Sequence, residues 1–170
     1  MPELVELVPY DASWPDHFLR IADALKSLLG SAVIAIEHIG STAIPGLSAK
    51  PMINVDVILP TVGDVLQANS LMVIAGYEPR GNRYDKDVFA FMKRATVPKQ
   101  RIYLCPEGSE THRRRIVFRN YLIAHPETSA AYEALKLSLA KEFAYDGDGY
   151  TAAKASFVSN VVDTARAVKQ

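Results

Sequence analysis

The sequence has a single cysteine and no excess of either charge. Cys105 is the one cysteine among the 170 residues, so the chain can form neither an internal disulfide nor a metal site made of several cysteines. Its 19 basic and 19 acidic residues balance. That balance argues against nonspecific nucleic-acid binding, because affinity for a phosphate backbone needs accumulated Lys and Arg. A disulfide-stabilised scaffold is excluded, and we do not expect nucleic acid as a partner.

Long apolar runs are also absent. No run reaches the roughly 20 residues that a membrane-spanning helix needs. The first residues, Met-Pro-Glu-Leu-Val-Glu, are acidic and lack the basic start and apolar core of a secretion signal. We therefore expect a cytoplasmic protein that has no membrane partner.

The residues that are present suffice for one well-packed unit. Hydrophobic residues make up 49% of the chain, and we expect a single domain over 1–170. Apolar spacing and end signals predict helices, which are 13–29, 62–75, 109–124, 127–143 and 150–168. Short segments rich in β-branched or apolar residues predict strands, which are 32–36, 52–59, 84–92 and 100–105. The pattern indicates an α+β (mixed α/β) fold, with a small mixed sheet flanked by helices and a helical part over about 109–170.

A Gly-Ser turn follows the first predicted strand. Gly40 lets the backbone approach a ligand, and a helical turn after it would direct free N–H groups at an anion. Ser41 and Thr42 add hydroxyl groups, and Lys50 can neutralise a phosphate. The alternative interpretation is a tight turn capped by a serine. For His38, beside this turn, we expect a hydrogen bond that fixes the loop.

The strand predicted over 52–59 carries two polar residues. Asn54 and Asp56 are two apart and share one face, while the alternate apolar residues face the core. Two carboxylates in this arrangement could share a divalent cation that bridges nucleotide phosphates. Here Asp56 alone is ionised, and Asn54 offers a neutral carbonyl oxygen. In the alternative interpretation, both are exposed polar residues on a half-buried strand.

The order of these segments resembles a known signature. An apolar strand, Gly40-Ser41, a spacer and a strand with Asn54 and Asp56 resemble the DNA polymerase β-like nucleotidyltransferase pattern, which has an acidic residue at the position of Asn54. The longer run 38–51, His-Ile-Gly-Ser-Thr-Ala-Ile-Pro-Gly-Leu-Ser-Ala-Lys-Pro, closely resembles the GrpB family of nucleotidyltransferase-like domains.

The resemblance extends over nearly the whole chain. The matching positions are Tyr10, Trp14, Phe18, Gly76-Tyr77, the run 118–122, His125-Pro126, Tyr132, Lys136, Tyr150 and Lys154. It implies the nucleotidyltransferase fold and, by its superfamily, an enzymatic role without a specific substrate. Similar domains also occur fused to dephospho-CoA kinase.

Basic residues cluster in the helix predicted over 109–124. Arg119 lies within the motif Phe-Arg-Asn-Tyr-Leu, and the family motif together with the aromatic neighbours favours a buried or pocket-facing guanidinium that binds phosphate or carboxylate through two hydrogen bonds. The preceding run 112–115, His-Arg-Arg-Arg, spreads around more than one helix face and is interpreted as a solvated surface. For Tyr150 and Lys154, at positions i and i+4, we expect the ring to pack against the lysine stem.

Several positions depart from the family pattern. Asn54 stands where relatives have Asp, Asn120 replaces an Asp, Ile123 replaces a common Arg, and Tyr103 replaces a frequent His. A third carboxylate is missing from 101–105. Each missing carboxylate removes a charge from the metal site and weakens Mg²⁺ binding.

Two hypotheses follow from these residues. In the first, the protein binds a nucleotide or other phosphorylated small molecule, and Gly40, Ser41 and Thr42 hold its phosphates while Lys50 and Arg119 balance their charge. Asp56 would then bind Mg²⁺, with Asn54 as a neutral co-ligand, and catalysis would transfer a nucleoside monophosphate. In the second, the chain is a non-catalytic ligand-binding or interaction module that has lost the metal. The sequence leaves open whether the protein is an enzyme.

Overall fold

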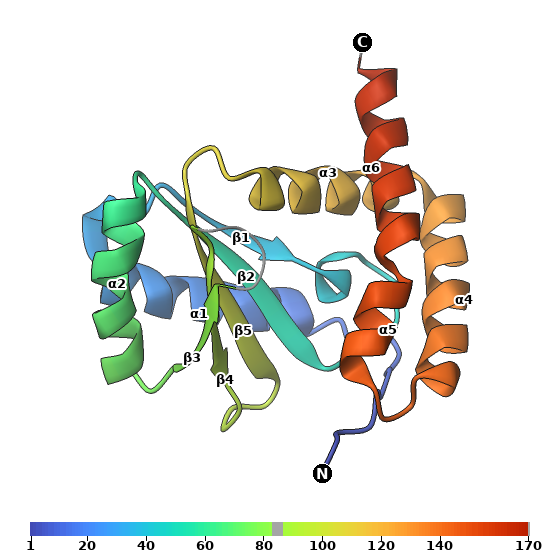
Figure 1. The fold of residues 1–170 in the computed structure, drawn as a ribbon, viewed down its shortest axis with the longest axis horizontal. Helices are drawn as coiled ribbons and strands as arrows, with labels where there is room; N and C mark the ends of the chain where they lie inside the picture. Colours follow the sequence, from blue (N-terminus) through green and yellow to red (C-terminus); the bar gives the residue numbers. More distant parts are fainter. Residues whose placement is uncertain (83–86, 170) are drawn as a thin grey trace.

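The structure is a computed structural model that describes residues 1–82 and 87–169 (Figure 1). Its helices are α1 (Trp14–Leu29), α2 (Val62–Ile74), α3 (Glu110–Ala124), α4 (Pro126–Glu142), α5 (Gly147–Ala153) and α6 (Ala155–Val168). Its strands are β1 (Ala35–Ile39), β2 (Met52–Leu59), β3 (Glu78–Asn82), β4 (Phe89–Lys93) and β5 (Lys99–Pro106). Short 3₁₀ turns occupy Gly30–Ala32 and Ser41–Ala43. The predicted mixed α+β fold with a helical C-terminal part is confirmed.

The five strands form one mixed sheet in the order β1-β2-β5-β4-β3. β2 and β5 run parallel, whereas the other neighbouring strands are antiparallel. In the β2–β5 register, Asn54 lies beside Arg101 and Asp56 lies beside Tyr103. This register brings polar side chains from two strands together.

The two faces of the sheet have different partners. Ile53, Val55 and Val57 of β2 are fully buried against an apolar core that α1 and α2 complete. The alternate residues of β2, among them Asn54 and Asp56, point to the opposite face, which α3 crosses (Figure 1). The predicted alternation along this strand is therefore confirmed.

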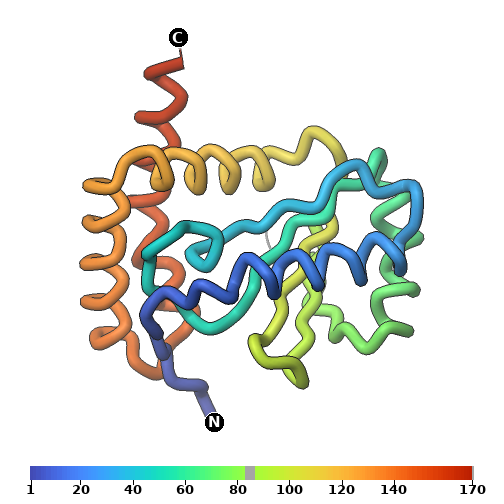
Figure 2. Tube along the Cα trace, turned by 180° about the vertical axis from the view of Figure 1, so that it is seen from behind, coloured from blue at the N-terminus to red at the C-terminus, as the bar shows by residue number. Residues whose placement is uncertain are grey.

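The helical C-terminal part packs against the loop that follows β1. Ile44 and Leu47 of this loop are buried with Phe118 of α3, Tyr132 of α4 and Val162 of α6. In Figure 2, the loop and α4 lie at the same end of the sheet. The loop that contains Gly40–Lys50 is thus held between the sheet and the helices.

Some predicted boundaries were wrong. β1 begins at Ala35 rather than at residue 32, because Gly30–Ala32 form a 3₁₀ turn. β1 is an edge strand, and of its residues Ile39 alone is buried. The strand predicted over 84–92 begins at residues outside the described part of the chain, and its described portion is β4. β3, exposed at every residue, was not predicted.

The helix predicted over 150–168 is two helices. α5 ends at Ala153 and α6 begins at Ala155, with Lys154 between them. Ser109 caps α3 by accepting a hydrogen bond from the His112 N–H, at 3.3 Å. Ser13 does not cap α1 with its side chain, because its hydroxyl donates to Asp11 instead. Across the described residues, no helix combines the length and apolar character needed to cross a membrane.

Candidate functional site

A cavity of about 560 Å³ lies between the sheet and the helical C-terminal part. Its walls come from the first half of β2 and β5, the turn Ser41–Ala43, and helices α3, α4, α5 and α6. This volume lies in the range of roughly 300–1,000 Å³ that is typical of small-molecule sites. The cavity is therefore large enough for a ligand of nucleotide size.

Cationic side chains dominate the polar lining of this cavity. They are Lys50, Arg101, Arg114, Arg115, Lys136 and Lys154. No Asp or Glu lines the cavity among the described residues. Among the described residues, Arg115 is the one of these six cations that forms an ion pair with a carboxylate. The cavity thus concentrates positive charge in a chain whose formal net charge is zero.

Two tyrosine rings position three of the lysines. The Lys154 ammonium lies 4.0 Å from the centre of the Tyr150 ring, and the Lys50 ammonium lies 4.8 Å from the same point. On α4, the Lys136 ammonium lies 5.1 Å from the centre of the Tyr132 ring. These cation–π contacts hold the ammonium groups at the cavity wall without neutralising them.

Lys136 is the most enclosed of the cations, with 1% of its surface exposed. Its ammonium donates hydrogen bonds to the Ser41 hydroxyl, at 2.9 Å, and to the Ser48 carbonyl. Burial lowers the pKa of Lys136 to about 8, partly offset by the Glu133 carboxylate. Burial also raises the pKa of Tyr132, which bonds to Ser41, to about 12. Ser41, predicted to hold phosphate, is thus in the cavity and bonded to a buried cation.

Lys154 combines burial with cationic neighbours. Burial, and then repulsion from Lys50, Lys136 and Arg101, lowers the pKa of Lys154 to about 7. Burial and the Arg101 charge also lower the pKa of Lys50. The positive charges in this cavity therefore repel one another, and a bound anion would relieve that repulsion.

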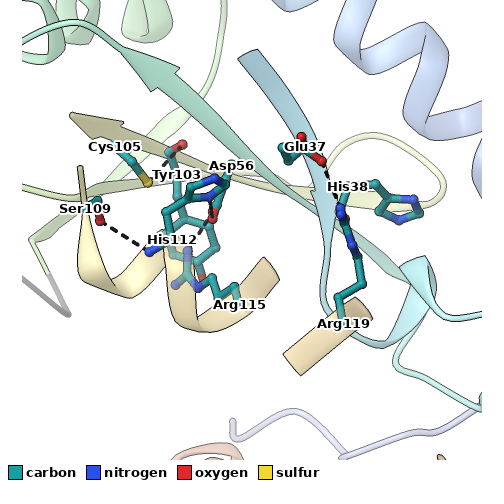
Figure 3. A network of polar contacts seen from close by, with 9 residues as sticks. All are labelled: Glu37, His38, Asp56, Tyr103, Cys105, Ser109, His112, Arg115 and Arg119. Carbon is teal, nitrogen blue, oxygen red and sulfur yellow. Dashed lines mark hydrogen bonds and ion pairs between the residues drawn. The ribbon is translucent and has the colours of Figure 1, made fainter. Parts of the chain in front are cut away.

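Asp56 is fully buried and bonded to two basic side chains (Figure 3). Its Oδ1 accepts from Arg115 Nη1 at 2.6 Å, and its Oδ2 lies 2.8 Å from His112 Nδ1. The Arg115 guanidinium also stacks 4.0 Å from the centre of the Tyr103 ring. Both oxygens of the predicted metal-binding carboxylate are thus engaged in a contact between β2 and α3.

Asn54 does not complete a set of metal ligands. Its Oδ1 is buried without a hydrogen-bond partner, and its register neighbour on β5 is the cation Arg101. Its Nδ2 would lie 2.8 Å from a Cβ atom placed on Gly40, where φ is +74°, so only glycine fits there. The described residues contain no group of three or more His, Cys, Asp or Glu side chains that could hold a metal. Mg²⁺ is usually held by one or two carboxylates together with phosphate oxygens and water, and the Asp56 oxygens are already bonded to Arg115 and His112, so these residues do not fit it.

His38 and Thr42 fix the turn itself. Thr42 is buried, and its hydroxyl lies 2.8 Å from His38 Nε2, as expected from the sequence. The His38 ring stacks on Phe18 with 4.8 Å between ring centres. Burial and the nearby Arg119 charge lower the pKa of His38 to about 4, so this histidine is neutral at pH 7. The turn is therefore rigid, and its Thr42 side chain is already bonded.

Arg119 lies outside the set of residues that line the cavity. Its Nη1 donates to Glu37 Oε2 at 2.9 Å and to the His38 carbonyl at 2.8 Å (Figure 3). Its Nε donates to Asn120 Oδ1 at 3.0 Å. Arg119 thus connects α3 to the end of β1. Among the residues predicted to bind phosphate, Gly40, Ser41, Thr42 and Lys50 do line the cavity.

Sequence reasoning missed much of the cationic lining. The spacing Tyr-x-x-x-Lys occurs at Tyr132–Lys136 and again at Tyr150–Lys154, and this repetition was the available signal. The interpretation of 112–115 as a solvated surface was wrong for His112 and Arg115, because α3 lies directly on the sheet. Arg113 is exposed, as that interpretation requires.

Comparison with known proteins identifies the family. The model of the GrpB protein family matches residues 4–164. This chain belongs to the GrpB family. Glutamate-rich protein GrpB of Alkalihalophilus pseudofirmus is 33% identical to this family member, over 94% of each chain. UPF0157 protein YqkA of Bacillus subtilis is 30% identical over 98% of this chain, which spans 48% of that relative's length.

Solved structures agree with this assignment. The crystal structure of GrpB from Enterococcus faecalis superposes on this family member with a TM-score of 0.85 at 28% identity, over 94% of this chain and 96% of that one. The Cid1 poly(U) polymerase with MgGTP bound gives a TM-score of 0.55 at 14% identity, over 80% of this chain and 44% of that one. The second likeness shows a nucleotidyltransferase-like fold. The dephospho-CoA kinase of Mycolicibacterium paratuberculosis is 27% identical over 88% of this chain and 43% of its own.

Proposed function

We propose that this GrpB family member binds a nucleotide or other phosphorylated small molecule in the cavity between its sheet and its helices. The observation that carries the proposal is a cavity with six cationic side chains and no carboxylate among its described lining residues. Phosphate is the common small-molecule group that satisfies several lysines and arginines at once.

The remaining lining residues suit the rest of such a ligand. Phe118, Tyr132 and Tyr150 present aromatic surface in the cavity. The ring centres of Phe118 and Tyr132 are 5.1 Å apart in an edge-to-face contact. A flat base or another ring could pack on this surface while its phosphates contact Lys50 and Lys154.

Binding, rather than metal-dependent transfer, is the function that this geometry supports best. Transfer of a nucleoside monophosphate with Mg²⁺ would need Asp56 to exchange Arg115 and His112 for the metal. It would also need further oxygen ligands, whereas Arg101 stands beside Asn54. The likeness to nucleotidyltransferases therefore supports the fold. The positive charges of the cavity support the binding of a phosphorylated ligand.

Thermal melting with a nucleotide series tests the proposal. ATP, GTP, CTP and UTP at millimolar concentration should raise the melting temperature, whereas the four nucleosides should not. The Lys154→Met variant should lose this response. Lys169→Met, which removes an exposed lysine at the end of α6, should keep it. If no nucleotide and no sugar phosphate stabilises the native protein, the proposal is wrong.

Asn54→Asp separates binding from metal-dependent transfer. We expect the substitution to create no stabilisation by Mg²⁺, because both Asp56 oxygens remain bonded to Arg115 and His112. It should instead weaken nucleotide binding, since it adds a negative charge beside Arg101. Asn54→Ser, which is neutral, is the control. Mg²⁺ affinity that appears only with the aspartate would mark the native chain as a family member that has lost its metal site, whereas equal Mg²⁺ affinity in the native protein would favour the transferase hypothesis.

A further inference from the structure

The cavity holds more unpaired positive charge than one phosphate can balance. Five of its six cations form no ion pair within 4 Å among the described residues, and these are Lys50, Arg101, Arg114, Lys136 and Lys154. A phosphate monoester carries about −1.5 to −2 charges at pH 7. A monophosphate would therefore leave most of these cations without a counter-charge.

The five cations also reach the cavity from different elements. Lys50 precedes β2, Arg101 lies on β5, Arg114 lies on α3, Lys136 lies on α4, and Lys154 lies between α5 and α6. The two arginines donate hydrogen bonds to neutral side chains: Arg114 to the Ser159 hydroxyl at 3.1 Å, and Arg101 to the Met92 sulfur at 3.6 Å. Charges distributed around a cavity in this way suit an extended anion rather than a compact one.

We propose that the cavity binds a metal-free di- or triphosphate group, for which its lysines and arginines replace the divalent cation. This proposal rests on the proposed function and names the charged part of the same ligand. A diphosphate or triphosphate brings roughly three to four negative charges, which approaches the number of unpaired cations.

A bound Mg²⁺ ion would oppose this arrangement. The ion would add two positive charges beside Arg101, Lys50 and Lys154, and like charges in a partly buried site repel strongly. It would also withdraw phosphate oxygens from the lysines that they would otherwise contact. The Asp56 carboxylate cannot attract the ion without releasing Arg115.

The lowered pKa values of two lysines agree with this assignment. Burial and mutual repulsion lower the pKa of Lys154 to about 7 and burial lowers that of Lys136 to about 8. An anion with several charges would remove the repulsion and return these amines to their charged forms. A cavity that normally enclosed a neutral ligand would derive no benefit from clustering the cations.

Isothermal titration at pH 7.5 and constant ionic strength tests the inference. One series uses phosphate, pyrophosphate and tripolyphosphate, and the other uses AMP, ADP and ATP. Each series is measured with EDTA and then with excess Mg²⁺. In EDTA, affinity should rise by roughly tenfold for each added phosphate, the effect of one further charge-assisted contact. Excess Mg²⁺ should weaken tripolyphosphate and ATP binding by a similar factor.

Three variants locate the effect in the cavity. Lys154→Met should lower tripolyphosphate affinity by roughly tenfold or more, and Lys154→Arg should retain most of it because the charge remains. Lys141→Met removes an exposed lysine from α4 and is the matched control, with affinity unchanged. An equal loss in the control variant would place the binding outside the cavity and overturn the inference.

The two series separate this inference from the proposed function. Nucleotides that bind only with Mg²⁺, or with equal affinity for any number of phosphates, would overturn the inference and keep the proposed function. Inorganic polyphosphates that bind in EDTA while every organic phosphate fails would keep the inference and reject a nucleotide or other organic phosphate as ligand. Failure of both series, with and without Mg²⁺, would reject both.

Discussion

At the scale of single residues, the charge of Lys154 opposes the stability of the folded protein. Its amine is partly buried on the Tyr150 ring, where neighbouring cations lower its pKa to about 7. A buried amine whose pKa is depressed destabilises the folded state whenever it carries its proton. Such a residue benefits the molecule only when an anion is bound.

Lys154→Met should therefore stabilise the ligand-free protein while it weakens anion binding. We expect the free energy of unfolding at pH 7 to rise by an amount on the order of 1 kcal/mol, because the methionine keeps the apolar contact and removes the charge. Chemical denaturation measures the change, and Lys169→Met at an exposed position should leave the free energy unchanged. A clear loss of stability in Lys154→Met would show that the ammonium is a structural contact.

At the scale of elements, ionic contacts to β1 and β2 hold α3 on the sheet. Asp56 of β2 binds Arg115 and His112, and Glu37 of β1 binds Arg119 (Figure 3). The first contact is fully enclosed on the carboxylate side, whereas the second is partly exposed. We therefore expect the Asp56 contact to contribute more to the position of α3.

Asp56→Asn should destabilise the protein strongly, and by the same amount with and without Mg²⁺. Removing one partner of a buried ion pair leaves an uncompensated charge, which costs about 3–5 kcal/mol. Denaturation in EDTA and in Mg²⁺ should give the same loss. Glu110→Gln on the exposed side of α3, which breaks an ion pair with Arg166, should cost less than about 1 kcal/mol. A loss for Asp56→Asn that appears only in the presence of Mg²⁺ would assign the carboxylate to a metal.

Local signals explain which elements the sequence could predict. β2 was predicted at its observed bounds because Pro60 ends it and its apolar residues alternate with polar ones. α2 was predicted to within one residue, since Gly76 follows it closely. The break at Lys154 was missed because no glycine or proline marks it. Boundaries that depend on tertiary packing carry no such local mark.

The same distinction applies to the candidate site. The Gly40–Thr42 turn was predicted from adjacent residues, and its histidine contact spans four positions. The contact of Lys136 with Ser41 joins residues 95 positions apart, and that of Arg115 with Asp56 joins residues 59 apart. Only the folded chain brings these groups together, so the sequence indicated a phosphate site but not its cationic wall.

At the scale of the whole molecule, pH should act on stability and on binding in opposite directions. Lys154 and Lys136 have pKa values of about 7 and 8 when folded, and an unfolded lysine has its ordinary value of 10.5. Between these values the unfolded chain holds more protons than the folded one. The contribution of the two lysines to stability therefore rises with pH from about 7 upward. Lys50 and Arg101 act on the Lys154 amine and the Glu133 carboxylate acts on that of Lys136, so these groups set the size of the effect.

Polyphosphate binding should instead weaken as the pH rises over the same range. The bound anion favours the charged amines, so the complex takes up protons that the free protein has released. Titration calorimetry in buffers of different ionisation enthalpy should show net proton uptake at pH 8. Affinity for tripolyphosphate should fall by up to about tenfold per pH unit and per proton taken up. Equal affinity at pH 7 and pH 9 would contradict this expectation.

The parallel pairing of β2 with β5 has an evolutionary consequence. Because neighbouring residues of a strand face opposite sides of the sheet, an insertion of one residue before Arg101 would turn this guanidinium toward the apolar core of α1 and α2. Insertions and deletions within β5 should therefore be eliminated by selection in relatives that share the cationic cavity. Length changes should accumulate in the segment between β3 and β4, whose ends lie on the far side of β5 from β2. The spacing of residues along β5 in relatives should therefore show whether the position of Arg101 faces the cavity in them as well.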